Sequence, residues 1–153
     1  MRARLNPTKA APAALGALAA LEQQVQRFSL ERPLVELMKI RASQLNGCAY
    51  CIHMHTRDAR AAGESEERIY LLDAWRESPL YSARERAALE WTEAVTLVAA
   101  GHVPDTAFAA ARAAFSEAEL VELTVAIAAI NAWNRIAISF RSMHPVTGVK
   151  AAA

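Results

Sequence analysis

The sequence has little glycine and little proline, the two residues that most often interrupt helices. Among its 153 residues there are only 5 glycines and 6 prolines. Alanine, the strongest helix former, occurs 35 times, so many of the apolar side chains are single methyl groups. This composition predicts an all-α protein with close packing between helices, and it argues against a β-sandwich.

The sequence also lacks an excess of charge of either sign. Seventeen Lys and Arg residues stand against 16 Asp and Glu residues, which leaves a formal net charge of +1. We therefore expect neither nucleic acid nor an anionic membrane as a main partner. The most apolar uncharged run, Leu123 to Asn134, is too short to span a bilayer, and Lys9 and Pro12 interrupt the apolar N-terminal stretch that faintly resembles a secretory signal. These features predict a soluble cytoplasmic protein.

The chain reads as a single domain over residues 1–153, because its length suits one core and no repeat is visible. Ser82 with Glu85, and Ser116 with Glu119, match the capping box that begins a helix. Six or seven helices are predicted, at Pro12–Phe28, Leu34–Leu45, Cys48–Ala62 with Asn46 as its N-cap, Ser65 to about Trp75, from Ser82 onward, Asp105–Ala114 and Ser116–Arg141. The last is apolar on nearly every side, which predicts burial in the centre or in a subunit interface.

Both cysteines of the sequence lie in one C-x-x-C motif, formed by Cys48 and Cys51. At about 100° per helical residue, these cysteines and His55 share one face of their helix, whereas His53 points elsewhere. Two thiols and an imidazole are the minimum set for cycling between a dithiol and a disulfide. The helix start also stabilises a thiolate, so at least one thiol is expected to be reactive near neutral pH.

The same residues allow two other interpretations. Cys48 and Cys51 behave as small buried hydrophobic residues in many proteins, with His55 as a hydrogen-bonded core histidine. The two thiols could also bind zinc together with His53 or His55, although a closed structural site needs about four ligands and no second pair is evident. Spacing alone leaves these interpretations open beside redox chemistry.

The stretch from Glu36 to His55 resembles the core of the alkylhydroperoxidase AhpD-like proteins of the carboxymuconolactone decarboxylase superfamily. That core has a glutamate twelve residues before the first cysteine, then C-x-x-C, then a histidine four residues after the second cysteine. Glu36, Cys48, Cys51 and His55 keep both spacings. The segments 75–81, 85–90 and 131–135 also look like a small branch of the family, so the resemblance covers nearly the whole chain.

The resemblance implies that Cys51 attacks a peroxide, that Cys48 is the resolving thiol, and that Glu36 and His55 relay the proton. It further implies a homo-trimer or homo-hexamer, no bound metal or prosthetic cofactor, and reduction by an external dithiol, either a lipoyl group or a thioredoxin-like protein. The best-known member has a histidine between the cysteines, where this chain has Tyr50. Because a phenol is a poor base at neutral pH, Tyr50 is expected to orient water or substrate rather than accept a proton.

Two other functions remain open at this point. One is a carboxymuconolactone decarboxylase-type enzyme on the same scaffold, although that branch does not rely on a C-x-x-C motif. The other is a non-catalytic, redox-responsive oligomeric protein. Individual residues also have structural alternatives: Glu36 could pair with Lys39 along its helix, and the polar residues of the last helix could cap neighbouring helices or bind a partner subunit. These polar residues are Asn131, Asn134 and Arg135, with Trp133 between them.

Overall fold

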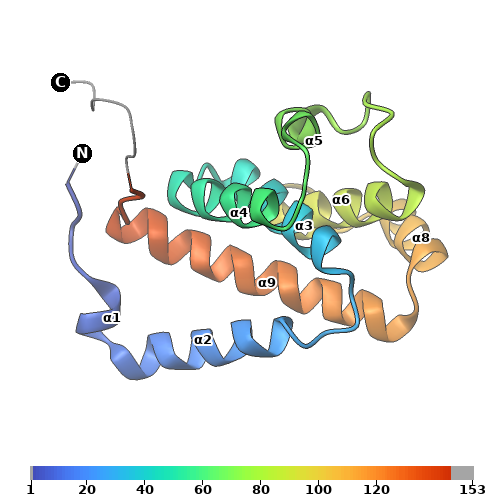
Figure 1. The fold of residues 1–153 in the computed structure, drawn as a ribbon. Coiled ribbons are helices and arrows are strands. Elements are labelled where there is room, and N and C mark those ends of the chain that lie inside the picture. The colour runs from blue at the N-terminus through green and yellow to red at the C-terminus, as the bar shows by residue number, and fades with distance from the viewer. Residues whose placement is uncertain (1, 146–153) are drawn as a thin grey trace.

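Helices form all the regular secondary structure of residues 2–145, the part of the chain that the computed structural model describes (Figure 1). The elements are α1 (Pro7–Ala10), α2 (Pro12–Val25), α3 (Arg32–Asn46), α4 (Ala49–Ala61), α5 (Glu66–Tyr70), the 3-10 helix η1 (Leu72–Ala74), α6 (Ala83–Thr96), α7 (Val98–Gly101), α8 (Asp105–Ala114) and α9 (Glu117–Phe140). The all-α prediction is confirmed. Six of these helices have ten residues or more, and the shorter α1, α5 and α7 bring the described total to nine α-helices.

The longest helix, α9, occupies the middle of the bundle. In Figure 1 it runs between α2 on one side and the layer of α3, α4 and α6 on the other, and it contacts all four. Its side chains Leu123, Ile127 and Ile130 are fully buried in the main core, where they meet Met38 of α3 and Trp91 of α6. Burial of each such side chain contributes about 1.5–3 kcal/mol, so α9 is the main source of core stability.

By length and composition alone, α9 is the one helix within residues 2–145 that could cross a bilayer. The uncharged run judged too short in the sequence is only its central part, and the complete helix has 24 residues. Core helices of globular proteins meet the same criterion, and α9 has neighbours on several sides. Within its apolar window 39% of the residues are buried, and apolar side chains such as Val121 and Ile138 are exposed.

The two predicted capping boxes are present. Ser82 accepts a hydrogen bond from the backbone of Glu85 at the start of α6, and the Glu85 carboxylate accepts one from the backbone of Ser82. Ser116 and Glu119 form the same reciprocal pair at the start of α9. Each box satisfies two backbone N–H groups that a helix start leaves free, which is why these boundaries could be read from the sequence.

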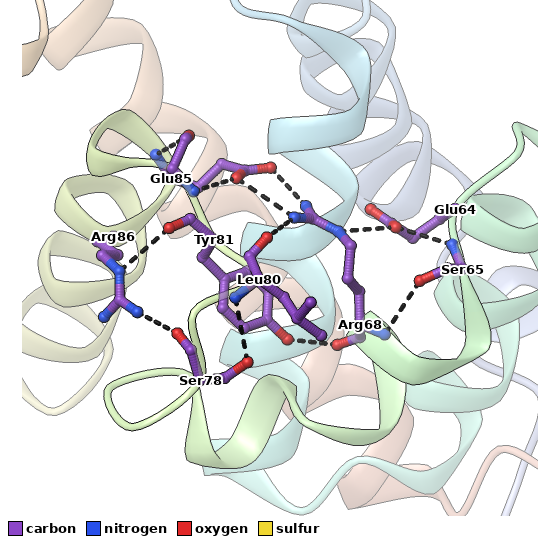
Figure 2. Close-up of polar contacts among 9 residues, drawn as sticks. Glu64, Ser65, Arg68, Ser78, Leu80, Tyr81, Glu85 and Arg86 are labelled. Carbon is purple, nitrogen blue, oxygen red and sulfur yellow. Dashed lines mark hydrogen bonds and ion pairs between the residues drawn. The ribbon is translucent and has the colours of Figure 1, made fainter.

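The helix predicted from Ser65 to about Trp75 is instead divided into α5 and η1. The backbone oxygen of Arg68 accepts a hydrogen bond from the hydroxyl of Tyr81, which lies just before α6. Figure 2 shows this contact inside a network in which the Arg68 guanidinium also binds Glu64, Glu85 and the carbonyl of Leu80. The network fixes the connection between α5 and α6, and it could not be predicted from local spacing.

The turn between α3 and α4 places the first cysteine. Gly47 has a φ of 69°, and its N–H donates to the carbonyl of Gln44 while the N–H of Cys48 donates to that of Ser43. This is a Schellman motif, which ends a helix and needs the left-handed conformation that glycine adopts without strain. The prediction that Asn46 caps the following helix is wrong, because Asn46 is the last residue of α3 and Cys48 is the N-cap of α4.

Candidate active site

Cys48 and Cys51 lie together at the start of α4. The sulfur of Cys48, in the N-cap position, accepts a hydrogen bond from the backbone N–H of Cys51 at 3.4 Å. Both are free thiols, and their exposed fractions are only 1% and 2%. With Tyr50 and Ala137 of α9 they form a small cluster separate from the main core. The expected pairing of the two sulfurs at a helix start is thus present.

The two thiols have opposite shifts in pKa. A hydrogen bond from the Cys51 side chain, together with the backbone N–H groups of Cys51 and Tyr50 and the side chain of Asn134, lowers the pKa of Cys48 to about 7 against the opposing effect of burial. The hydrogen bond to Cys48, burial and the nearby negative charge all raise the pKa of Cys51. Ionisation is therefore favoured at Cys48 and opposed at Cys51, which acts as the hydrogen-bond donor of the pair.

Glu36 of α3 and His55 of α4 form a hydrogen-bonded pair. The distance between His55 Nδ1 and Glu36 Oε2 is 2.9 Å. Burial opposes ionisation of Glu36, but the hydrogen bond from His55 and the positive charges of His55, Lys39 and Arg32 outweigh it, so the pKa of Glu36 is lowered. Because an ionised carboxylate can only accept, Nδ1 is the donor, and Nε2 is left to accept or release a proton.

The alternative pairing of Glu36 with Lys39 is wrong. The Lys39 side chain, with an exposed fraction of 1%, donates instead to Glu22 of α2. A buried ammonium needs a close carboxylate, and Glu22 supplies it from a helix that sequence spacing could not bring near. Glu36 is thereby left free to orient His55.

Two neighbouring cavities open beside this group. The first, which we call the thiol cavity, has a volume of about 400 Å³ and is lined by Cys51, Leu15, the N-terminal residues 3 and 5–8, Ile136, Ala137, Ser142 and Met143. The second, the histidine cavity, has about 440 Å³ and is lined by Glu22, Gln26, Arg32, Glu36, Lys39, His55 and Asp58. Tyr50, Met54 and Trp133 line both. These three side chains thus lie between the first cavity, which Cys51 lines, and the second, which the His55–Glu36 pair lines.

The other histidine of α4 lies outside this arrangement. The ring of His53 stacks on that of His144, with ring centroids 4.8 Å apart. Within residues 2–145 no three His, Cys, Asp or Glu side chains are grouped as metal ligands would be. The zinc interpretation, which needed His53 or His55 beside both thiols and further ligands, therefore gains no support from the geometry.

The polar residues of α9 bond a neighbouring helix, as the sequence indicated, but their amide network beneath the thiols was not predicted. Asn46 Nδ2 donates to Asn131 Oδ1 at 2.9 Å and to Asn134 Oδ1 at 2.8 Å, and Asn134 Nδ2 donates to Ser43 Oγ at 3.1 Å. Asn134 has an exposed fraction of 0%, and it is the member that also lowers the pKa of Cys48. The only signal in the sequence was two asparagines three residues apart in an apolar helix, which placed them on one face but did not connect them with the cysteines.

Taken together, the all-helical fold, the C-x-x-C pair at a helix start and the glutamate–histidine pair one turn away define an AhpD-like dithiol protein. The match to a family model supports this class independently: residues 10–94 match the carboxymuconolactone decarboxylase family. The chain belongs to this family.

Several known proteins are similar over most of the chain. The uncharacterized protein YdfG of Bacillus subtilis (strain 168) is 44% identical over 139 residues, which is 91% of this chain and 95% of YdfG. The crystal structure of ATU0492 from Agrobacterium tumefaciens, a protein of unknown function for which a role as the antioxidant defence protein AhpD has been suggested, has a TM-score of 0.93. It is 52% identical, covering 95% of this chain and 99% of its own.

A more distant match shows the fold alone. The debrominase Bmp8 has a TM-score of 0.82 at 21% identity, over 91% of this chain and 75% of Bmp8. The helical scaffold is therefore kept where most of the sequence has changed.

Proposed function

We propose that the protein is a thiol-dependent peroxidase that reduces peroxides through the Cys48–Cys51 dithiol, with Glu36 and His55 as its proton relay. The observation that carries this proposal is the division of roles between the sulfurs. Cys51 lines the thiol cavity, whereas Cys48 holds the thiolate that can take the proton of Cys51. The opposite pKa shifts make Cys48 the proton acceptor and Cys51 the proton donor of the pair.

In the first step, the sulfur of Cys51 attacks the terminal oxygen of the peroxide while its proton passes to the thiolate of Cys48. The O–O bond breaks, Cys51 becomes a sulfenic acid, and the departing oxygen takes a proton from His55 to leave as an alcohol or as water. Cys48 then attacks the sulfenic sulfur, a disulfide forms and water leaves. Two thiols and one peroxide thus give one disulfide, one alcohol and one water, a balanced two-electron oxidation of the pair.

An external dithiol closes the cycle by thiol–disulfide exchange, through a mixed disulfide with one of the two cysteines. A lipoyl group or a thioredoxin-like protein would serve as this reductant in the cytoplasm. Tyr50 lies on the wall shared by the two cavities and would orient the peroxide by hydrogen bonding. The functional form would be a homo-trimer or homo-hexamer. We infer these partners from the family to which the chain belongs.

Peroxide consumption with a dithiol donor tests the proposal. Cys51→Ser should abolish turnover, and Glu36→Gln should reduce it by about tenfold to a hundredfold, because His55 loses the partner that orients it. His53→Ala is the matched control, since this histidine belongs to the same helix but stacks on His144. Equal rates for wild type and Cys51→Ser would end the claim. Turnover of a lactone that survives the loss of both cysteines would favour decarboxylation instead.

A further inference from the structure

The N-terminal segment of residues 2–11, which we call the arm, is fastened to the far end of the chain. The backbone N–H of Arg4 donates to the carbonyl of Phe140 at 3.0 Å, and its guanidinium donates to the carbonyl of Ser139 at 2.9 Å. Both carbonyls belong to the last turn of α9, where a helix has free acceptors and the negative end of its dipole. In Figure 1 the first part of the arm passes this end of α9 before the chain forms α1.

The arm is also part of the wall of the thiol cavity. Ala3, Leu5 and residues 6–8 line this cavity together with Cys51. Because Cys51 has an exposed fraction of only 2%, a reagent reaches its sulfur through the cavity and not from open solvent. The arm therefore helps to determine which molecules can enter the cavity and reach Cys51.

Within residues 2–145, the arm buries little apolar surface. None of the residues of α1 is buried, and Leu5 has an exposed fraction of 45%. Segments with so little buried apolar surface open at low free-energy cost. The hydrogen bond from the Arg4 guanidinium to Ser139, together with the backbone bond from Arg4 to Phe140, fastens the arm where it lines the thiol cavity.

We infer that the arm is a size filter for Cys51 and that Arg4 is the positioning residue that closes it. A small peroxide fits within about 400 Å³ and can react with the arm in place. A bulky thiol-reactive molecule, including a dithiol carried on a protein, must bring its reactive atom within bonding distance of the buried sulfur, and for this the arm has to open. This inference shares one assumption with the proposed function, namely that Cys51 is the sulfur with which substrates react.

Two maleimides of the same chemistry but different size test the filter. In a Cys48→Ser background, in which Cys51 is the one remaining cysteine, the rate of labelling by N-ethylmaleimide is compared with that by a long poly(ethylene glycol) maleimide. Arg4→Ala should raise the rate with the polymer by about tenfold, as expected for the loss of one charge-assisted hydrogen bond, and the rate with the small reagent by less than about twofold. Arg4→Lys, which keeps the charge and a donor, should restore most of the selectivity.

Arg2→Ala is the matched control, because it removes an exposed arginine from the same arm. It should leave both labelling rates unchanged. Equal acceleration of the two reagents by Arg4→Ala would mean general loosening and would overturn the inference, as would no change with either reagent. Because labelling requires no turnover, these outcomes are separate from those of the peroxidase assay. An inactive protein could still have the filter, and an active one could lack it.

Discussion

Two of the polar networks in this fold differ in charge. Beneath the thiols, Asn46, Asn131 and Asn134 connect α3 with α9 through neutral amides that are buried or partly buried. At the connection between α5 and α6, Arg68 joins Glu64 and Glu85 in an ionic network that remains partly open to water. Both satisfy polar groups inside the bundle, yet only the neutral one touches the cysteines.

The difference shows how the charge of the thiol pair is controlled. A carboxylate beside Cys48 would raise the pKa of its thiol, and an ammonium would fix the charge in place. With amides there instead, short hydrogen bonds and the helix start determine which sulfur is ionised. The ionic network lies where Coulomb energy can hold a loop without acting on the thiols.

The largest expected effect is that of Asn134→Ala. This change removes the amide that donates to buried Ser43 and one of the acceptors of Asn46, which keeps its bonds to Asn131 and to the carbonyl of Ala42. The loss of two hydrogen bonds in the buried network should lower the free energy of unfolding by about 3 kcal/mol. The pKa of Cys48 should rise, because the amide that lowers it is lost. Urea unfolding measures the first quantity, and thiolate absorbance as a function of pH measures the second.

Asn131→Ala is the control for this prediction, since Asn131 bonds to Asn46 and Thr96 and is not among the groups that shift the pKa of Cys48. Asn131→Ala should reduce the free energy of unfolding but leave the pKa of Cys48 unchanged. If both variants moved the titration equally, the amides would not act on the thiol individually, and the contrast between Asn131 and Asn134 would fail.

Arg68→Ala should reduce the free energy of unfolding by about 2 kcal/mol, because Glu85 and Glu64 lose a partly buried partner. Unlike Asn134→Ala, it should leave the pKa of Cys48 unchanged. The same pair of measurements, urea unfolding and thiolate absorbance, separates the two variants. A shifted thiol titration in Arg68→Ala would contradict the separation between the networks.

Gly47→Ala should cost about 1 kcal/mol, because the turn before Cys48 keeps a φ of 69° that alanine adopts only with strain. An added Cβ would meet no atom within 4 Å, so the cost is conformational. Gly16→Ala is the matched control in the middle of α2, where the same change should stabilise the protein by about 0.5–1 kcal/mol. Thermal unfolding of the two variants should thus shift in opposite directions.

The smallest effect concerns the pH dependence of the ionic network. Burial raises the pKa of Glu85, but hydrogen bonds from Arg68 and Ser82 outweigh it, so its pKa lies below 4.5 in the folded protein. Its contribution is therefore complete above about pH 4.5 and is lost as the pH falls through the lower folded pKa. The difference in free energy of unfolding between wild type and Glu85→Gln should therefore become smaller as the pH falls from 6 to 3. Urea unfolding at several pH values measures this difference. A difference that stayed constant over these pH values would contradict the prediction.

Local signals account for what the sequence could predict. The all-α class, the long helices and both capping boxes depend on residues that are near one another in the chain. Helical spacing brought the two cysteines together, because one turn of α4 separates them. The contact between Glu36 of α3 and His55 of α4 was indicated by the family resemblance and not by spacing within one helix.

What could not be predicted depends on contacts between distant residues. Lys39 forms a salt bridge with Glu22 of α2, and the hydroxyl of Tyr81 bonds to the backbone of Arg68 in the helix expected after Ser65. Asn134 of α9 contacts Cys48. The N-cap was assigned to Asn46 for a different reason. Asparagine is a common N-cap, but here Asn46 still belongs to α3, and the Schellman turn at Gly47 moves the start of the next helix to Cys48. Packing between elements decided the first three cases, and local turn geometry decided the N-cap.

The position of Cys48 as the N-cap of α4 also links sulfur chemistry to backbone dynamics. A sulfur bound in a disulfide is a weaker acceptor than a thiolate, so oxidation would weaken the hydrogen bond from the amide of Cys51. The first turn of α4 would then fray in the oxidised protein and tighten again on reduction. Hydrogen–deuterium exchange at this single amide would therefore report the oxidation state of the pair.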